Sequence, residues 1–321
     1  ANFTTNGGGS IAARGASNQV EFQRQLDKIV ANLRGLDADV YGLMEVQNNG
    51  FETATDGTAF NGKSAIQTLV DALNAAATAA GDTADYAYVH QANTGSDAIT
   101  VAVIYRSSKV TPVGTAATPD TSVYDAFVGT TYGNRVPVAQ TFASNQDGEK
   151  FTVVVNHLKS KGSGTALQGT DAGDGQGSST IARERAVEQL KAWLQTHPTG
   201  DADSDVLLVG DFNAYSGEKA VSDLTSDGYE KVSHGYSYSF DGLWGSLDHM
   251  FASQELANSG QIAGVYKWGI NAEEPVVLDY NTDFGKPADS YAGDPYRSSD
   301  HNPIVIGLNL GTPPVQPPVE Q

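Results

Sequence analysis

Apolar and polar residues alternate along the chain with two different periods, and the changes of period mark the predicted elements. Apolar residues recur at helical spacing in residues 18–36, 64–81 and 180–197, which predicts three amphipathic helices. Short runs rich in β-branched and aromatic residues predict strands. These runs are residues 39–47, 85–91, 98–108, 135–144, 151–157, 205–213, 236–242, 246–253, 262–270 and 303–310. Many short strands with few helices predict an α+β sandwich, in which two packed sheets are flanked by helices.

A stretch rich in glycine and serine, residues 162–179, is predicted to be a loop. Loops of this length without secondary structure are either functional or disordered, and the composition favours disorder. Lys159, Lys161, Arg183 and Arg185 flank the loop and are candidates for a local basic lip. For the two arginines, an ordinary solvated helix face is the alternative.

The chain is strongly acidic. It has 38 Asp and Glu residues against 19 Lys and Arg, which gives a formal net charge of −19 over 321 residues. A tight, groove-filling electrostatic complex with nucleic acid needs a basic face, so this charge argues against one. If the substrate is a phosphodiester, divalent cations and a few local Lys or Arg side chains must supply the positive field. The acidity itself is typical of a surface adapted to a salty or secreted setting.

The chain contains no cysteine, which excludes disulfides and thiolate metal sites and leaves His, Asp, Glu and Asn as strong metal ligands. No apolar stretch is long enough to span a bilayer. The length suits one large domain, which we place at residues 1–310. The chain opens with "ANFTTNGGGS", as an excised segment would, and residues 311–321 have the composition of a Pro-rich linker. We therefore expect a monomer that is part of a larger multidomain chain, without stable membrane insertion.

Polar residues stand at the ends of several predicted strands. Glu45, His157 and Asp211 with Asn213 close apolar runs, whereas Asp248 and the pair Asp300-His301 open them. The exit of one antiparallel strand lies beside the entrance of the next, so these residues are expected to meet at one sheet edge. Taken singly, each has a structural alternative as a cap or turn residue. Taken together, an oxygen-rich group with few imidazoles suits Mg²⁺, Ca²⁺ or Mn²⁺. A hard cation beside proton-transfer groups is what hydrolysis of a phosphate ester requires.

The sequence spells Asp-His twice, at Asp248-His249 and at Asp300-His301. Strand alternation places the side chain of His249 on the face opposite to Asp248, together with Phe251. We therefore expect His249 to be a packing residue and only Asp248 of that pair to join the site.

The order and wording of these motifs resemble the endonuclease/exonuclease/phosphatase superfamily, and within it the secreted bacterial nucleases of the ExeM type. The matching stretches are collinear and extend through most of the chain. They are "ARGAS", "LDADVYGLMEVQNNG", "GSDAITVAVIYR", "NRVPVAQTF", "VVVNHLKSKGS", "DAGDGQG", "LLVGDFNAY", "SFDGLWGSLDHMFAS", "WGINAEEPVVLDYN" and "YRSSDHNP". The resemblance implies a four-layered α/β/β/α sandwich, with two packed mixed or antiparallel β-sheets flanked by helices.

The resemblance also implies roles at the metal and at the attacked phosphate. Glu45, Asp211 and Asp300 match metal ligands of the family. Asp211 and Asn213 match the pair that orients the attacking water and contacts metal or phosphate, with Asp211 helping to deprotonate the water. His301 matches the histidine that stabilises charge on the phosphoryl oxygens in the transition state.

Four further roles follow from the resemblance. His157 matches the histidine proposed to protonate the leaving 3′ oxygen, and Asp248 matches the carboxylate that fixes the tautomer of His301. Arg135 matches an arginine that contacts the substrate phosphate, with a loop arginine in a surface ion pair as the alternative. Asp97 is the candidate partner of His157.

The sequence departs from the family pattern at three places. The family carries a metal-ligating Asn in its first core strand, which would precede Ala1, and Asn2 does not fill that role. Absence of this strand would weaken metal binding. Asn302 stands where close relatives usually have Asp, and Gly269 stands where relatives often have His.

The function implied by the resemblance is that of a divalent-metal-dependent nuclease, secreted or at the bacterial cell surface. It would hydrolyse DNA, with RNA as a further substrate, by in-line attack of activated water that leaves a 5′ phosphate. Mg²⁺ or Mn²⁺ would be the cofactor, with Ca²⁺ as a candidate structural ion. The acidic surface predicts weak DNA binding of low sequence specificity. Two alternatives stay open: a phosphodiesterase for lipids or small molecules, and an inactive binding or adhesion module of a larger surface protein.

Overall fold

The structure, a computed structural model, describes residues 15–55, 60–162, 164–203, 205–282 and 290–311. Its α-helices are α1 (Gln19–Leu36), α2 (Ala65–Ala80), α3 (Thr180–Leu194), α4 (Lys219–Ser226) and α5 (Gln254–Asn258). The strands of the first half are β1 (Val40–Gln47), β2 (Tyr86–Tyr88), β3 (Ile99–Arg106), β4 (Val110–Ala117), β5 (Val138–Ser144) and β6 (Lys150–His157). Those of the second half are β7 (Val206–Asp211), β8 (Tyr229–Lys231), β9 (Tyr238–Phe240), β10 (Leu243–Gly245), β11 (Asp248–Ser253), β12 (Ile262–Lys267) and β13 (Ile304–Leu308). Short 3₁₀ helices lie at Phe60–Gly62, Asp125–Phe127 and Val276–Leu278.

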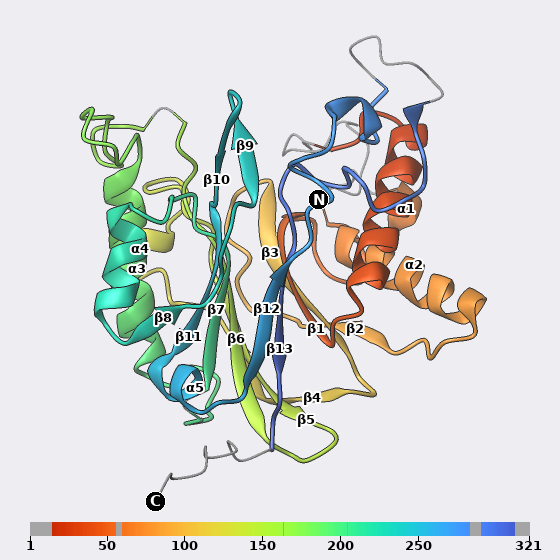
Figure 1. Ribbon diagram of the computed structural model, residues 1–321, viewed down its shortest axis with the longest axis horizontal. Coiled ribbons are helices and arrows are strands. Elements are labelled where there is room, and N and C mark those ends of the chain that lie inside the picture. The colour runs from red at the N-terminus through yellow and green to blue at the C-terminus, as the bar shows by residue number, and fades with distance from the viewer. Residues whose placement is uncertain (1–14, 56–59, 163, 204, 283–289, 312–321) are drawn as a thin grey trace, which may run out of the picture.

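These elements form four layers (Figure 1). Helices α1 and α2 cover one side of the molecule, α3 and α4 cover the other, and the sheets lie between them. One sheet has the strand order β4-β5-β6-β7-β11-β8, and a second has the order β1-β3-β2. Strands β12 and β13 pair with each other, and β9 and β10 form a separate hairpin. The predicted α+β, four-layered sandwich is confirmed.

Three apolar clusters hold the layers together. Leu69 and Ile104 belong to the cluster between the pair α1–α2 and the smaller sheet. Val187 belongs to the cluster beneath α3 and α4. Val103 and Val155 belong to the cluster between the two sheets. Complete burial of a side chain of this size contributes about 1.5–3 kcal/mol relative to exposure, so the three clusters together determine the layer order.

The helix ends follow from local sequence. Asn18 caps α1 by accepting a hydrogen bond from the backbone N–H of Glu21 at 3.0 Å, and Ser64 caps α2 by accepting one from Gln67 at 3.2 Å. Helix α2 ends at Gly81, which has a φ of 82°, a conformation that glycine adopts without steric cost. These helices begin and end within one residue of the predicted bounds, whereas α3 ends three residues before the predicted 197.

Strands β6 and β7 are parallel, unlike the other strand pairs of the large sheet. A parallel pair needs a long crossover connection, and the Gly/Ser-rich loop with α3 supplies it. At the end of β7, Gly210 has a φ of 132°. A Cβ atom there would lie 2.0 Å from the carbonyl oxygen of Asn156. Glycine is therefore required where β7 approaches β6 most closely, one residue before Asp211.

Five of these strands and α-helices were not predicted from the sequence, namely β4, β8, β10, α4 and α5. Strand β4 contains Pro112 and Gly114, and proline is tolerated in strands only at sheet edges; β4 is an outer strand of its sheet. Helix α4 is only eight residues long, too short for its apolar period to be recognised. The predicted Pro-rich tail at 311–321 lies outside the described residues beyond Gly311, as do Ala1 and Asn2. Within the described part of the chain, no helix is long and apolar enough to cross a membrane.

Candidate active site

Three of the predicted site residues lie in one row across three neighbouring strands. The parallel register pairs His157 of β6 with Asp211 of β7, and the antiparallel register pairs Asp211 with Asp248 of β11. All three side chains are buried. His157 Nε2 lies 3.6 Å from Asp211 Oδ2. The expectation that these strand ends meet at one edge is confirmed for this sheet.

His301, which precedes β13 of the two-stranded β12–β13 sheet, joins the row from outside the large sheet. Its Nδ1 lies 2.7 Å from Oδ2 of Asp248, and the hydroxyl of Ser237 donates to the same oxygen at 2.5 Å. Burial alone would lower the pKa of His301, but the charge of Asp248, with those of Asp211 and Asp300, raises this pKa to about 10. The ring is therefore an imidazolium at neutral pH, with Nδ1–H directed to Asp248.

Asp211 is the most strongly perturbed acid of the site. Burial, followed by the charges of Asp248 and Glu45, raises the pKa of Asp211 to about 7, against the opposing effect of His301. Asn213 binds both carboxylate oxygens: its backbone N–H donates to Oδ1 at 2.7 Å, and its Nδ2 donates to Oδ2 at 3.1 Å. These two hydrogen bonds depend on a left-handed backbone conformation at Asn213, where φ is 48°. Asn adopts this conformation more readily than most residues.

Arg135 connects His157 to Asp97. Its Nε donates to Oδ2 of Asp97 at 3.0 Å, and its Nη1 lies 3.3 Å from Nε2 of His157. A guanidinium can only donate, so this contact requires an unprotonated Nε2. The link from Asp97 to His157 thus passes through Arg135, and a direct pairing of Asp97 with His157 stays a prediction.

Glu45 and Asp300 are more exposed than the row, but they line the same cavity as Asp211, Asp248 and His301. Glu45 lies at a bulge in β1 with a φ of 58°. Their charges reach the row, since Glu45 raises the pKa of Asp211 and Asp300 raises that of His301. The two acidic residues therefore belong to the electrostatic environment of the site.

This donor set fits a hard divalent cation. The closest group of candidate ligands in the described residues is Asp211, Asp248 and His301, whose ligand atoms lie within 4.8 Å of one another. Asp248 and His301 are hydrogen-bonded to each other as a charge pair, so we do not assign them as metal ligands. The carboxylates of Glu45, Asp211 and Asp300 would hold the ion. The pKa of Asp211 is raised partly because nearby carboxylates add negative charge that nothing compensates, and a bound cation would neutralise this charge.

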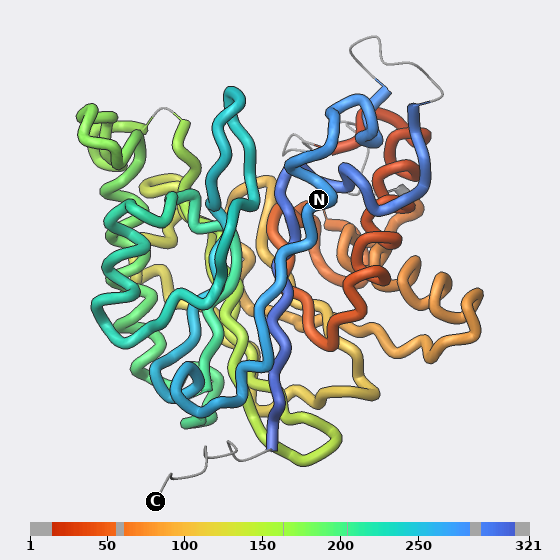
Figure 2. Tube along the Cα trace, in the orientation of Figure 1, coloured from red at the N-terminus to blue at the C-terminus, as the bar shows by residue number. Residues whose placement is uncertain are grey.

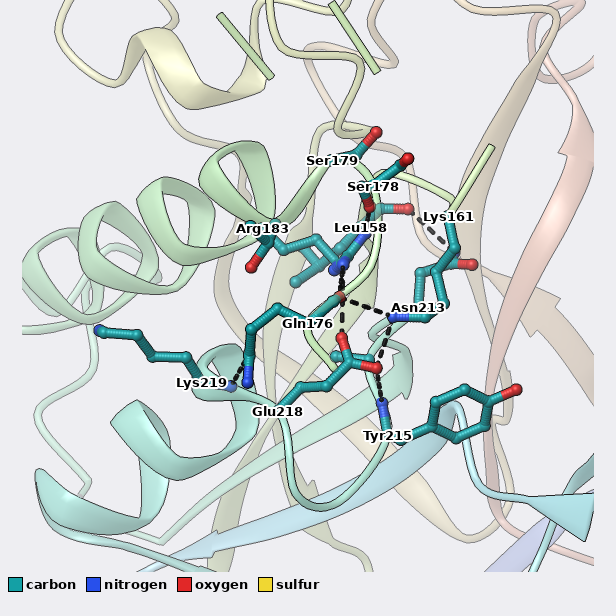
Figure 3. Close-up of polar contacts among 12 residues, drawn as sticks. Leu158, Lys161, Gln176, Ser178, Ser179, Arg183, Asn213, Tyr215, Glu218 and Lys219 are labelled. Atoms are coloured by element: carbon teal, nitrogen blue, oxygen red, sulfur yellow. Dashed lines mark hydrogen bonds and ion pairs between the residues drawn. The ribbon is translucent and has the colours of Figure 1, made fainter. Parts of the chain in front are cut away.

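The Gly-rich loop is held next to the site by a buried arginine (Figure 3). Arg183 is fully buried. It donates to the carbonyls of Lys159, Ser178 and Gln176 at 3.1, 2.9 and 3.1 Å. It also lies 3.3 Å from Oε2 of Glu218, whose other oxygen accepts from Lys161.

The predicted basic lip is therefore wrong for both arginines. The guanidinium of Arg183 is fully occupied by Glu218 and by backbone carbonyls. Arg185 forms an ion pair with Asp125 through two hydrogen bonds, each 2.8 Å long. Lys161 is paired with Glu218 as well. The predicted disorder of the loop is also wrong for its described residues, because these contacts order a segment that has few apolar side chains of its own. Glycine permits the tight turns, and the arginine binds the carbonyls that these turns leave without partners.

A sequence model of the Endonuclease/Exonuclease/phosphatase family matches residues 6–301, which is most of the chain. The chain belongs to this family. Membership makes it a hydrolase of phosphoester bonds in a family that depends on divalent metals. The more specific likeness to ExeM-type nucleases stays a prediction.

Solved structures share the fold of this family member at low sequence identity. A family protein from Leptotrichia buccalis is 16% identical, with a TM-score of 0.55, over 93% of this chain and 96% of that chain. A mannosyl-6-phosphatase from Bacteroides thetaiotaomicron is 14% identical, with a TM-score of 0.53, over 89% and 91%. D. rerio TDP2 complexed with single strand DNA product is 14% identical, with a TM-score of 0.52, over 91% and 94%. No curated protein matches the chain in sequence. At these identities the likeness shows the fold alone.

Two residues that contact the site were not predicted. Ser237 binds Asp248, and the ring of Tyr238 stacks on that of His301 with centroids 4.5 Å apart. Both lie at the base of the β9–β10 hairpin. The only sequence signal is the Tyr-rich run that leads into β11, and it does not indicate which ring faces the site.

His249 is a packing residue, as predicted. It is buried, its Nε2 lies 2.8 Å from the carbonyl of Ala214, and its ring packs between Phe212 and Phe251. Burial lowers its pKa to about 4, so the ring stays neutral. The two Asp-His pairs therefore serve different purposes.

Asn302 and Gly269, the two positions at which the sequence departs from its family pattern, both lie next to Glu273. The Oδ1 of Asn302 accepts from the N–H groups of Asn271 and Ala272 at 2.9 and 3.0 Å, and its Nδ2 donates to Glu273 at 2.6 Å. A Cβ atom on Gly269 would lie 3.1 Å from the Glu273 carboxylate. Asn302 supplies the donor that this carboxylate needs, and Gly269 leaves room for it. Asp at position 302 would have no proton to give.

We expect the Asp248→Asn variant to release His301 from its charged partner. The pKa of His301 should fall from about 10 toward its ordinary 6.5, because the amide keeps an acceptor but loses the charge. NMR titration of His301 in metal-free protein measures the fall. The alkaline limb of the rate against bis(p-nitrophenyl) phosphate should move to lower pH by the same amount. Ser237→Ala is the matched control because it keeps the carboxylate, and identical titration in wild type and Asp248→Asn would contradict the assignment.

We expect Asn302→Asp to destabilise the fold by about 1–3 kcal/mol, because it replaces the donor to Glu273 with a second carboxylate. Urea unfolding at pH 8 measures the loss. Adding Glu273→Gln should restore most of the stability, because Gln can donate to the new Asp. Equal losses in the single and double variants would show that Glu273 is not the cause.

We expect Arg183→Met to cost about 3–5 kcal/mol, because it removes the buried guanidinium that pairs with Glu218 and donates to three backbone carbonyls. Arg185→Met, two residues along the same helix, removes a half-exposed ion pair and should cost about 0–1 kcal/mol. Thermal unfolding of both variants tests the contrast. Equal effects of the two substitutions would contradict a special role for the buried arginine.

Proposed function

We propose that the chain is a divalent-metal-dependent nuclease that hydrolyses phosphodiester bonds of DNA by in-line attack of water and leaves a 5′ phosphate. The observation that carries the proposal is the row of His157, Asp211, Asp248 and His301. It sets the imidazole of His157, the carboxyl of Asp211 with its raised pKa and the imidazolium of His301 beside one another at one edge. A base, an acid and a charge stabiliser are the groups that such a displacement needs.

Asp211 is the proposed general base. Burial raises the pKa of this carboxyl in the metal-free chain, which makes it a better proton acceptor than an exposed carboxylate, and a bound cation would reduce that rise. Asn213 holds both of its oxygens in place, so the base does not rotate away from the water. His301 would donate its Nε2–H to a phosphoryl oxygen, because its Nδ1–H is bound by Asp248.

His157 and Arg135 are proposed to act at the leaving oxygen and the substrate phosphate. Nε2 of His157 would first take up a proton, for which Oδ2 of Asp211 lies 3.6 Å away, and would then pass it to the leaving 3′ oxygen. Arg135 would at that point donate its hydrogen bond to the phosphate instead of to the ring. A cation held by Glu45, Asp211 and Asp300, Mg²⁺ or Mn²⁺ in this proposal, would neutralise charge on the phosphate and lower the pKa of a bound water. A structural Ca²⁺ is a further ion to test for.

DNA is the proposed substrate, with RNA as a second polymer to test. One structural neighbour, TDP2, was solved with a single strand DNA product, which supports a nucleic acid substrate for this fold; another is a mannosyl-6-phosphatase. The net charge of −19 favours weak binding with few phosphate contacts and a shallow salt dependence. A secreted or cell-surface location in a bacterium, as a monomeric domain of a larger chain, is part of the same proposal.

Digestion of circular and linear plasmid DNA with Mg²⁺, with and without EDTA, tests the function. We expect cleavage that EDTA abolishes, and a loss of about 10²–10⁴-fold in Asp211→Asn, the magnitude typical of a missing general base. Asp201→Asn is the matched control, since Asp201 pairs with Lys150 at the opposite end of the strands. Full activity in Asp211→Asn would exclude the mechanism. A folded protein inactive on every phosphoester would favour the adhesion module.

A second candidate function rests on the β9–β10 hairpin, which projects beyond the sheets in Figure 1. At its tip, Phe240 and Leu243 are 60% and 75% exposed, and Trp244 is 47% exposed. Exposed apolar residues gathered on one protrusion are typical of a membrane-contacting or ligand-contacting surface. Together with the stacking of Tyr238 on His301, they favour a phosphodiesterase that acts on lipid headgroups.

Sphingomyelin vesicles and plasmid DNA, tested side by side with Mg²⁺, separate the two functions. If lipid is the substrate, Phe240→Ser with Leu243→Ser should reduce hydrolysis of vesicles at least about tenfold, because the apolar anchor is lost. The rate on a soluble phosphodiester should stay the same. Hydrolysis of DNA alone would exclude the lipid reading.

A further inference from the structure

Arg297 stands three residues before Asp300 and lines the same cavity as Asp211 and His301. Among the described residues, Lys109 is the only other Lys or Arg on the walls of that cavity. The side chain of Arg297 is half-buried. A cation therefore lies beside a site whose other ionisable groups are mostly acids.

Arg297 differs from the other described arginines in its partners. Arg24 packs on the ring of Tyr291. The others pair with carboxylates, and they are Arg34, Arg106, Arg135, Arg183 and Arg185. Arg297 donates one hydrogen bond, from Nη1 to the carbonyl of Asn271 at 2.7 Å, and pairs with no carboxylate in the described part of the chain. A guanidinium has five N–H donors, so most of those of Arg297 are available to a ligand.

The backbone at Arg297 is held in a strained conformation. Its φ is 54°, in the left-handed region that residues other than Gly, Asn and Asp seldom adopt. The segment lies along α1 (Figure 2), where Nζ of the buried Lys28 donates to the carbonyl of Tyr296 at 2.8 Å. The N–H of Arg297 itself donates to the carbonyl of Ile270 at 2.7 Å. Strain that surrounding contacts maintain in this way is typical of functional sites.

Asn271 connects Arg297 to His301. The carbonyl of Asn271 accepts from Arg297, and its Nδ2 donates to the carbonyl of His301 at 2.7 Å. Its Oδ1 accepts from the N–H of Ser298 at 3.0 Å. Asn271 is buried, so a single residue fixes the turn from 297 to 301 near both of its ends. The guanidinium of Arg297 is thereby anchored in a defined position relative to His301.

Two cations stand at opposite ends of the series of contacts that makes up the site. The series runs in the order Arg135, His157, Asp211, Asp248, His301, Asn271 and Arg297. The charge of Arg297 also reaches Tyr238, whose ring stacks on His301, because it opposes the rise in the pKa of Tyr238 that burial and Asp300 cause. When a phosphate is attacked beside Asp211 and His301, an anionic group of the substrate on the far side of His301 would therefore meet Arg297.

We propose that Arg297 binds a second phosphate of the substrate, next to the attacked phosphodiester, so that the site takes a nucleic acid strand with at least two phosphates. A planar guanidinium binds a phosphate through two parallel hydrogen bonds. In a chain with a net charge of −19, such a contact supplies local attraction that the surface as a whole does not. The inference rests on the proposed hydrolysis of phosphodiesters, and it disfavours a lipid with a single phosphate such as sphingomyelin.

Isothermal titration calorimetry of the full chain with Mg²⁺ tests the second phosphate. Thymidine 3′,5′-bisphosphate should bind about 10–100-fold more tightly than the 3′- or the 5′-monophosphate, as expected of one charge-assisted contact. Arg297→Met should reduce this difference to at most about threefold and leave the binding of the monophosphates nearly unchanged. Arg297→Gly is a second variant, because glycine adopts the φ of this position without steric cost and so preserves the turn. It should lose the difference as well.

Lys109→Met is the matched control, because it removes the same charge from another wall of the cavity, and it should keep the difference. Equal binding of the bisphosphate and the monophosphates by the wild type would overturn the proposal. So would Arg297 variants that keep the difference, or that lose all three ligands equally. Inositol 1,4-bisphosphate bound as tightly as the thymidine bisphosphate would overturn the assignment to nucleic acid. Binding does not require hydrolysis, so failure here and failure of the nuclease assay are distinguishable.

Discussion

Hydrogen bonding is parallel between β6 and β7 and antiparallel between β7 and β11, and this register places His157, Asp211 and Asp248 in one row. A slip of one residue would turn each side chain to the other face of the sheet. The close approach that sets the register depends on Gly210, because a Cβ there would collide with the carbonyl of Asn156. The chemistry of the site is thus determined first by backbone pairing.

The ionisable side chains of the row are buried, and a buried charge is costly unless an opposite charge lies beside it. Asp248 stabilises His301 as an imidazolium, and His301 partly offsets the acids around Asp211. Because His301 belongs to the segment before β13 and Asp211 to β7, the balance depends on how the β12–β13 pair packs beside the large sheet. Glu45 and Asp300 add negative charge, so the site favours a cation over an anion unless a metal is present.

The strand row could be predicted in part, because polar residues mark the strand ends in the sequence. The argument from antiparallel ends holds for Asp211 with Asp248, whereas His157 and Asp211 meet because β6 and β7 are parallel, which the sequence analysis did not predict. His249 could be assigned to packing by alternation alone. Contacts between side chains from distant loops could not be predicted. Ser237 and Tyr238 reach the site only through the hairpin geometry, and the bond from Arg135 to Asp97 joins residues 38 positions apart. Arg183 was predicted to be exposed, but it is buried. Its position in a helix beside a glycine-rich run does not indicate that the run will fold over it.

The covering loop and the catalytic edge share one short segment of backbone. Arg183 binds the carbonyl of Lys159, while Asn213 and Arg135 both donate to the preceding carbonyl, that of Leu158, at 3.0 and 3.2 Å. The N–H of Leu158 in turn donates to the carbonyl of Asp211 at 2.9 Å. The carbonyl of Lys159 is therefore bound by the arginine that orders the loop, and the adjacent carbonyl of Leu158 is bound by two residues of the site. A loop with few apolar side chains is ordered by the same peptide groups that position the base and its partner, so loop order and site geometry are coupled through the backbone.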